Sequence, residues 1–390
     1  MRIGITCHPS AGGSGILATE LGIALAERGH TVHFVTYEPP FRLQHFHENI
    51  FCHYVQPPSY PLFRYPPMTL ALATKISEVA EENQVSLWHA HYAIPHAACA
   101  LLGRDMLPEE HRFKIITTLH GTDITLVGSD PSFFRLTKYA MEQSDAVTAV
   151  SDWLTQETLR EFQLRAPIRT IHNFVNMSKF DDYHADRCRL AEREEKIVMH
   201  ISNFRPVKRV TDVVRVFKRI AEAIPARLIM VGDGPERMSA VGVAKQLGIQ
   251  DRVKYMGNQD NVESLMTCAD LIIQPSEHES FGLVPLEAMA CRVPVIGTRS
   301  GGVVEVVEDG VTGYLCEVGD IEAMARKSIA ILSDPELAEE MGRQGNQRAL
   351  ERFGRDSIVD IYEALYRKLL EPGETGTRAA APPTASLSGD

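Results

Sequence analysis

Residues 276–287 read SEHESFGLVPLE and follow an apolar run at residues 269–273. Such a run predicts a buried parallel strand that ends in a loop. A helix is expected next, with Ser280 as its N-cap, because Pro285 is tolerated only in a first turn. The stretch therefore predicts a strand–loop–helix unit of an α/β fold, with an acidic loop at the N-terminus of the helix.

The expected helix start is a candidate site for phosphate. Free backbone N–H groups and the helix dipole attract anions there, and Gly282 allows a ligand to approach the backbone closely. Glu279 and Glu287 flank this position. Two carboxylates would repel a diphosphate unless they accept hydrogen bonds from sugar hydroxyl groups, so the pattern favours a nucleotide-sugar site. The alternative is a pair of solvated charges beside a helix start.

Glu279 and Glu287 are separated by seven residues, among them Phe281, Gly282 and Leu283. This pattern resembles the donor-site signature of retaining GT-B glycosyltransferases of family four, and the resemblance extends over roughly residues 1–370. It implies an α/β fold of the GT-B type, in which two doubly wound Rossmann-like domains face each other across a cleft. It also implies that Glu287 holds the nucleotide ribose, that Glu279 lies near the transferred sugar, and that the backbone of residues 281–283 meets the donor.

Composition limits the function classes. The chain has 390 residues, of which 44% are hydrophobic, so it is long enough for two α/β domains. Its formal net charge of −11 argues against a general nucleic-acid or anionic-membrane surface. The seven cysteines include no C-x-x-C pair, which is typical of a reduced, cytoplasmic protein. No stretch has the ~20 apolar residues of a membrane span, and the sequence leaves homo-oligomerisation open.

The first half of the chain predicts a doubly wound parallel sheet, because strand patterns alternate with helical stretches. The strands are expected at residues 2–7, 31–36, 86–91, 113–119, 145–150 and 168–171. Polar groups follow three of them, at residues 89–92, 118–123 and 151–152. Ligands of such sheets bind at the carboxyl ends of the strands, so these groups predict one rim of a cleft.

A glycine-rich loop, Gly12-Gly13-Ser14-Gly15, follows the first strand and precedes a helix expected at residues 16–27. The loop departs from the G-x-G-x-x-G dinucleotide fingerprint, so a nicotinamide cofactor is not indicated. It is either a backbone-amide cradle for a donor or acceptor anion, involving Gly13 and Ser14, or a tight strand-to-helix turn.

Three histidines fall at the predicted rim. His89 and His91 share one face of a strand, but no third ligand stands at a metal spacing, so we expect structural histidines and no metal. His120 belongs to the segment LHGTD, which resembles the cleft loop of the family. The resemblance implies that His120 reaches the donor sugar and the reaction centre; the alternative is an incidental histidine beside a helix cap.

Residues 171–176 resemble the crossover between the two domains of the family. We expect an acceptor-binding domain at residues 1–172, a nucleotide-sugar-binding domain at residues 173–355, and a final helix at residues 356–370 that crosses back to the first. Residues 372–390 predict a disordered tail. The second domain is predicted to hold a helix at residues 209–223, helical stretches at residues 321–352, and strands at residues 196–202, 227–231, 253–256, 269–273, 293–297 and 314–317.

A basic loop, SNFRPVKR at residues 202–209, follows the first strand of the second domain. The resemblance implies that Lys208 neutralises the donor diphosphate. The usual arginine of the family falls on Asn203, and Arg205 is displaced by two positions, which is a departure from the pattern. The alternative is a solvated basic helix start. Glycine turns and loops near Gly232 and Asp260 are expected to line the nucleotide and its base.

The expected chemistry needs no metal. Lys208, with Arg205 and the amides of residues 281–283, would stabilise the departing diphosphate, and each such donor lowers a barrier by ~3 kcal/mol. The chain has no D-x-D signature, and we expect no metal or other cofactor.

The acceptor is predicted from resemblance alone. Residues 5–15, 40–43, 89–96, 117–125 and 202–209 resemble a narrower group of the family. This implies transfer of N-acetylglucosamine from UDP-GlcNAc to the hydroxyl group of L-malate with retained α configuration, as the first step of bacillithiol biosynthesis. Competing functions are transfer to another sugar or a lipid, UDP-GlcNAc epimerisation, and nonenzymatic nucleotide binding. Candidate acceptor ligands are Gly13, Ser14, Tyr92, Thr118 and Asn173, with Arg42 and Arg64 as candidate charge partners.

Overall fold

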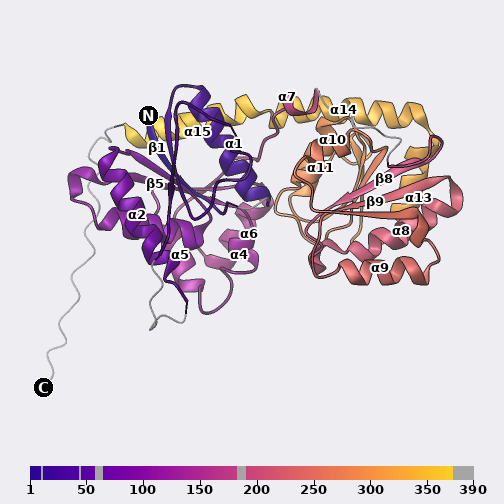
Figure 1. The fold of residues 1–390 in the computed structure, drawn as a ribbon, viewed down its shortest axis with the longest axis horizontal. Helices are drawn as coiled ribbons and strands as arrows, with labels where there is room; N and C mark the ends of the chain where they lie inside the picture. Colours follow the sequence, from indigo (N-terminus) through magenta and orange to yellow (C-terminus); the bar gives the residue numbers. More distant parts are fainter. Residues whose placement is uncertain (10–11, 44, 58–64, 182–189, 372–390) are drawn as a thin grey trace, which may run out of the picture.

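Two α/β lobes lie side by side in the computed structural model, which describes residues 1–9, 12–43, 45–57, 65–181 and 190–371 (Figure 1). Each lobe is built on one parallel sheet. The expected tail at residues 372–390 and the candidate Arg64 lie outside the described residues. Within the described part of the chain, no helix is both long and apolar enough to cross a membrane.

The first sheet has seven strands in the order β3-β2-β1-β4-β5-β6-β7. Six of them match the predicted ranges closely, but β3 is missing from the prediction. Its residues are mostly half-buried or exposed and include His53 and Tyr54, so they show no apolar alternation. The strands are β1 (Arg2–Thr6), β2 (Thr31–Thr36), β3 (Ile50–Tyr54), β4 (Leu87–His91), β5 (Lys114–Leu119), β6 (Ala146–Ala149) and β7 (Ile168–Thr170).

The second sheet has six strands in the order β10-β9-β8-β11-β12-β13, and all six were expected. Their strand order reverses between β8 and β11, as the first sheet reverses between β1 and β4. Ligands of doubly wound sheets bind at these reversal points. The strands are β8 (Lys196–Ile201), β9 (Ala226–Val231), β10 (Val253–Gly257), β11 (Leu271–Gln274), β12 (Val295–Thr298) and β13 (Gly313–Cys316).

Helices cover both faces of each sheet. In the first lobe, α1 and α15 share one core cluster with β1, while α2 and α3 share another with β4. The helices are α1 (Gly13–Glu27), α2 (Met68–Glu82), α3 (Ala98–Asp105), α4 (Thr122–Thr125), α5 (Phe134–Gln143), α6 (Asp152–Phe162), α7 (Ser178–Asp181), α8 (Val210–Ala223), α9 (Arg237–Gln246), α10 (Val262–Met266), α11 (Leu283–Ala290), α12 (Val303–Val306), α13 (Ile321–Ser333), α14 (Pro335–Phe353) and α15 (Arg355–Leu370).

The chain passes between the lobes twice, and the two passages are hydrogen-bonded to each other. Val175 N donates to Phe353 O at 2.9 Å, and Arg355 N donates to Val175 O at 3.1 Å. After the second passage, α15 packs on the first lobe while α14 lies on the second (Figure 1). The paired passages form one hinge, which lies next to the start of α15.

The predicted strand–loop–helix unit is present as β11 and α11, but its cap differs from the prediction. Pro285 lies in the first turn of α11, as expected, whereas the N-cap is Gly282 and not Ser280. Gly282 has a φ of 101°, a conformation that a side chain disfavours. Ser280 is instead used for contacts with the first lobe.

Candidate active site in the interdomain cleft

The loop between β11 and α11 is backed by a glycine pair. Added Cβ atoms at Gly301 and Gly302 would lie 2.2 Å from Glu279 O and 2.4 Å from Ser280 O. Gly302 N also donates to Glu279 O at 2.7 Å. The turn at residues 300–302 therefore fixes the backbone of the loop that carries Glu279. Glycines are needed in this turn because the two backbones pack so closely.

Lys208 and Glu279, two predicted donor ligands, form an ion pair in the second lobe. Lys208 Nζ donates to Glu279 Oε1 at 2.5 Å, and both side chains are largely buried. The same oxygen accepts a hydrogen bond from Ser276 Oγ at 2.9 Å. The lysine comes from the helical turn Pro206–Lys208 that follows β8, and the carboxylate comes from the loop after β11. These are the two strands at which the strand order of the sheet reverses.

The glycine turn that contains Gly232 packs against the backbone of the basic loop at residues 202–209. An added Cβ at Gly232 would lie 1.8 Å from Ser202 O, and one at Gly234 would lie 2.0 Å from Asn203 O. Asn203 and Arg205 themselves are exposed. Gly232 therefore acts through packing, and the two polar side chains remain available to a ligand.

The positive charge of Arg205, in the second lobe, acts on Tyr92 in the first lobe. Burial raises the pKa of the Tyr92 hydroxyl and Asp123 adds to the rise, whereas the positive charge of Arg205 opposes it. Arg205 of the second lobe therefore lies within electrostatic range of Tyr92 of the first.

Glu287 lies in a cluster of charges that the sequence did not predict. Burial raises its pKa to about 7, Arg42 opposes the rise, and the carboxylates of Glu263 and Glu20 add to it. Arg42 forms an ion pair with Glu263 of the second lobe and lies 3.6 Å from Glu20 of the first. Lys179, in the crossover, also pairs with Glu20. Arg42, expected as a charge partner of the acceptor, is thus engaged with Glu20 and Glu263 in the cluster that surrounds Glu287.

Three residues of the first lobe, Gly13, Gly121 and Ser151, contact the end of the loop between β11 and α11 or the start of α11. An added Cβ at Gly13 would lie 3.4 Å from Leu283, and one at Gly121 would lie 1.7 Å from Ser280 Oγ. Ser151 Oγ donates to Ser280 O at 2.5 Å. Two of the predicted site residues, Gly13 and Leu283, therefore lie against each other at the boundary between the lobes.

His120 and Tyr92 stack on each other at the carboxyl ends of β5 and β4, with ring centroids 5.4 Å apart. Tyr92 accepts a hydrogen bond from Ser14 Oγ at 3.2 Å. His120 Nε2 lies 2.9 Å from His91 Nδ1, and burial lowers the pKa of His120 to about 3. Ser14, Tyr92 and His120 thus form one polar wall.

Asp123 anchors this wall, although the sequence analysis did not select it. Its carboxylate accepts hydrogen bonds from the backbone N–H groups of Ala93, His120 and Gly121, at 2.9–3.1 Å. Burial raises its pKa to about 6, against the effect of these hydrogen bonds. The sequence signal that could have identified this role is the position of Asp123, three residues after His120.

Three predicted ligands, Thr118, Asn173 and Asp260, do not belong to the polar wall. The Thr118 hydroxyl is buried and lies 2.6 Å from both His89 Nε2 and Thr148 Oγ1, so it supports the histidines from beneath. Asn173 is half-buried in the crossover, and Asp260 is exposed in the loop before α10. The expected structural role of His89 is confirmed, because Tyr366 and Thr118 hold its two ring nitrogens.

A second polar contact joins the lobes at Glu305 of α12. Its carboxylate accepts hydrogen bonds from Asp152 N, Trp153 N and His172 Nε2, each at 2.9 Å. Asp152, His172 and Glu305 are residue types that bind metals, and their ligand atoms lie within 4.8 Å of one another. Because both Glu305 oxygens already accept N–H groups, the geometry favours a helix cap for α6 over an ion site.

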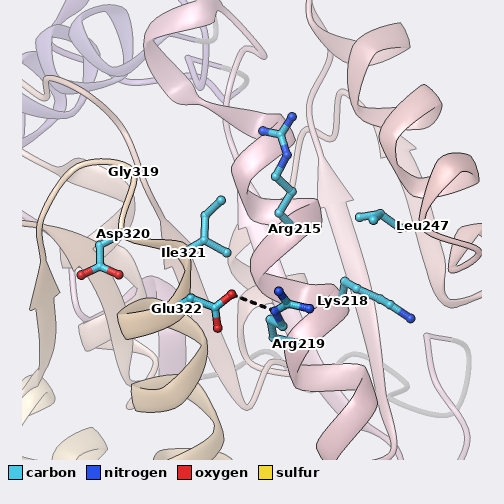
Figure 2. Close-up of a pocket in the computed structure, with 8 residues that line it drawn as sticks. All are labelled: Arg215, Lys218, Arg219, Leu247, Gly319, Asp320, Ile321 and Glu322. Atoms are coloured by element: carbon cyan, nitrogen blue, oxygen red, sulfur yellow. Dashed lines mark hydrogen bonds and ion pairs between the residues drawn. The ribbon is translucent and has the colours of Figure 1, made fainter.

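A cavity of about 440 Å³ lies elsewhere in the second lobe, between α8 and the start of α13 (Figure 2). Arg219 from α8 forms an ion pair with Glu322 from α13 at 2.9 Å across it. Its lining includes none of the predicted site residues, so it is separate from the cleft.

Comparison with known proteins identifies the class. A family model described as Glycosyl transferases group 1 matches residues 185–348, and one described as Glycosyltransferase Family 4 matches residues 11–179. The chain belongs to glycosyltransferase family 4, and it is an enzyme with the GT-B fold. It is 49% identical to the N-acetyl-alpha-D-glucosaminyl L-malate synthase of Bacillus anthracis, over 96% of this chain and 99% of that protein.

Solved structures share the fold over nearly the whole chain. Sucrose-phosphate synthase from Thermosynechococcus elongatus matches with a TM-score of 0.77 and 25% identity, covering 95% of this chain and 99% of that one. Anabaena HepE in complex with UDP-glucose matches with a TM-score of 0.75 and 21% identity, covering 94% and 100%. The predicted fold is confirmed.

Proposed function

We propose that this glycosyltransferase moves N-acetylglucosamine from UDP-GlcNAc to the hydroxyl group of L-malate, with retention of the α configuration, and so begins bacillithiol biosynthesis. The observation that carries the proposal is the 49% identity to an enzyme of that name over 96% of the chain. It is supported by the segments of resemblance, which lie on both sides of the cleft.

On the donor side, we assign the diphosphate to Lys208, Arg205 and the amides at the start of α11. Lys208 lies 2.5 Å from Glu279, so the diphosphate and the sugar would share one polar site. Glu287 is assigned to the ribose, because its carboxylate lies beyond the same helix start. Gly232 and Asp260 complete the nucleotide side, the former by packing and the latter from an exposed loop.

On the acceptor side, we assign L-malate to the polar wall formed by Ser14, Tyr92 and His120, together with Gly13 of the same glycine-rich loop and Asn173 of the crossover. The hydroxyl group of the acceptor attacks the anomeric carbon from the face that the diphosphate leaves. The bond from the anomeric carbon to the diphosphate oxygen breaks as the new glycosidic bond forms, and the departing phosphate takes the hydroxyl proton. Lys208 and the backbone amides stabilise the charge that develops on that phosphate.

The proposal includes catalysis without a metal, domain limits at residues 1–172 and 173–355, and a cytoplasmic location. Arg205 and Lys208, once the diphosphate displaces Glu279 from Lys208, supply two positive charges for the diphosphate. The hinge between Val175 and Phe353 supports the domain limits. Cys7, Cys52, Cys99, Cys291 and Cys316 are free thiols, which fits a reducing compartment.

The test is UDP release from UDP-GlcNAc with and without L-malate, with the product identified by mass. Malate-dependent release and a product with the mass of N-acetylglucosaminyl malate are expected, and a chelator should leave the rate unchanged. Conversion of UDP-GlcNAc without malate would favour the epimerase, release with a different acceptor would change the substrate, and no turnover would leave only nucleotide binding.

A further inference from the structure

Four histidines gather where three strands of the first lobe end. His8 follows β1, His91 ends β4, His96 lies in the helical turn after β4, and His120 follows β5. The rings of His8 and His96 are 4.6 Å apart, and those of His91 and His120 are 5.2 Å apart. His8 and His120 are partly exposed, whereas His91 and His96 are each 2% exposed. We call this group the histidine cluster.

The two buried members lack hydrogen-bond partners. Both ring nitrogens of His96 and the Nε2 of His91 are buried without one. Changing the tautomer does not solve this, because His91 uses Nδ1 to contact His120 and its Nε2 is left as either a bare N–H group or a bare lone pair. An unmade buried hydrogen bond costs about 1–3 kcal/mol. Such groups indicate a ligand that completes the site.

The surroundings determine which ligand fits. Three titratable groups adjoin the cluster: His89 stacks on His91, Tyr92 stacks on His120, and Asp123 accepts the backbone N–H of His120. Tyr362 and Tyr366 of α15 lie further away, against His89, and Arg205 acts electrostatically on Tyr92. Asp123 already accepts three backbone N–H groups, and His89 is held by Tyr366 and Thr118. Burial lowers the pKa of His91 and of His96 well below the usual value, so the empty cluster is neutral at pH 7.

An anionic acceptor requires a charge partner, and the arginine expected for it is engaged elsewhere. Arg42 pairs with Glu263 and lies 3.6 Å from Glu20. A carboxylate bound in the histidine cluster would accept N–H groups from the partly exposed His8 and His120 and from the unpartnered ring nitrogens behind them. Its negative charge would also stabilise an imidazolium ion, which raises the pKa of the rings.

We propose that the histidine cluster binds a carboxylate group of the acceptor and takes up one proton from solvent as it does so. This rests on the proposed function, because it concerns how the same site recognises L-malate. No covalent bond changes in this step; the proton moves from the buffer to an imidazole nitrogen. His96 is the acceptor-specificity residue that the sequence analysis did not select, because both its ring nitrogens lack a partner and its ring lies 4.6 Å from that of His8.

The experiment is calorimetry of L-malate binding to the UDP-saturated enzyme at pH 7.5, in two buffers of different ionisation enthalpy. Uptake of about one proton per malate is expected. The KM for malate should rise by up to about tenfold per pH unit above neutrality, while the KM for UDP-GlcNAc follows a different profile.

His96→Gln keeps hydrogen-bonding groups but cannot be protonated near neutrality. It should lower the proton uptake to less than about half and raise the KM for malate about tenfold, with UDP affinity retained as evidence of folding. The matched control is His33→Gln, because His33 pairs with His53 at 3.1 Å within the same lobe but in mid-strand. The control should leave both malate parameters unchanged.

Two outcomes separate the proposals. Malate-dependent turnover with no proton uptake and a pH-independent KM for malate would overturn the histidine proposal alone. Absence of malate-dependent UDP release would overturn the proposed function, and the histidine proposal with it. If His96→Gln does not fold, the buffer comparison and the pH profile of the unaltered enzyme decide the matter.

Discussion

Lys208 Nζ donates a hydrogen bond to Glu279 Oε1 at 2.5 Å, so the cation assigned to the donor diphosphate is neutralised by the carboxylate assigned to the donor sugar. An incoming diphosphate must compete with Glu279 for this lysine. Once the pair is broken, Glu279 can accept hydrogen bonds from sugar hydroxyl groups. With these assignments, we expect binding of the two parts of the donor to be coupled, so that the site favours a complete nucleotide sugar over either part alone.

Lys208→Ala should reduce kcat by about a hundredfold, which corresponds to the loss of ~3 kcal/mol of charge stabilisation in the transition state. Steady-state kinetics with UDP-GlcNAc and L-malate measure this. Lys218→Ala is the matched control, because Lys218 lies on α8 and pairs with Glu222 at 3.2 Å, away from the donor loop. A kcat within threefold of the unaltered enzyme would remove Lys208 from the catalytic machinery.

Glu279→Gln should have opposite effects on binding and turnover. Removing the competing carboxylate frees Lys208, so UDP should bind about fivefold more tightly. Turnover should fall about a hundredfold, because the sugar loses its acceptor group. Titration of UDP by calorimetry, together with kcat, distinguishes this from a simple structural defect, which would weaken both.

Glu287 predicts a pH dependence of donor binding. Burial raises its pKa to about 7, so about half of the unliganded protein carries a neutral Glu287 at neutral pH. Ribose hydroxyl groups donate to the ionised form, so UDP affinity should fall by up to about tenfold per unit as the pH drops below 7.

Glu287→Gln should remove this pH dependence of UDP binding, as measured by calorimetry between pH 5.5 and 8.5. The raised pKa also means that burial favours the protonated carboxyl group in the folded state. The contribution of Glu287 to stability is therefore present below its ordinary pKa of 4.5 and is lost as the pH rises through 7. An unchanged pH profile in the variant would assign the dependence to another group.

The contacts of Glu305 predict how much the polar contact between the lobes contributes to the free energy of unfolding. Glu305→Ala removes the acceptor for Asp152 N and Trp153 N at the start of α6, which should lower the free energy of unfolding by about 1–2 kcal/mol. Although burial opposes it, the hydrogen bond from His172 leads the effects that hold the pKa of Glu305 below its usual value. The stabilisation should therefore persist at neutral pH and be lost as the pH falls below 4.5.

Urea denaturation at pH 7 and pH 4 measures this difference. Glu308→Ala is a suitable control, because Glu308 is more exposed and pairs with Arg348 at 2.9 Å within the second lobe. Equal losses for both variants at pH 7 would mean that the contact between the lobes adds nothing.

Local patterns predicted most of the fold, because buried parallel strands are continuous apolar runs followed by turn residues. The strand β11 and the loop that carries Glu279 were found in this way. The strand β3 was not, because its edge position leaves residues such as His53 and Tyr54 partly exposed. Exposure of this kind erases the apolar pattern on which the prediction depends.

Contacts between the lobes could not be predicted from the same patterns. The partners Arg42 and Glu263 are separated by 221 positions, and the segment 40–43 that contains Arg42 carries no local sign of its partner. Ser280 has the residue type of a helix cap, but its carbonyl accepts from Ser151 and its side chain lies against Gly121. A local preference was overridden here by the closure of the cleft.

The close approach of Gly121 to Ser280 predicts that closure of the two lobes is required for turnover but not for nucleotide binding. A Cβ at this position would lie 1.7 Å from Ser280 Oγ and 2.6 Å from Ser280 Cβ, so Gly121→Ala should hold the lobes apart. Because the nucleotide is assigned to the second lobe, UDP affinity should stay within about threefold while kcat falls by about a hundredfold or more, since misplacement of reacting groups by an ångström is that costly.

The double variant Gly121→Ala with Ser280→Gly tests the cause. Ser280→Gly removes both clashing atoms and leaves the Cα at 3.8 Å, an ordinary contact, so activity should recover by at least about tenfold. Gly121 has a φ of 111°, and strain from that angle would persist in the double variant. Gly29→Ala, at a φ of 84° with no atom within 4 Å, measures the effect of strain alone. Recovery in the double variant therefore assigns the loss to contact between the lobes, whereas a double variant as inactive as the single one would assign it to the backbone.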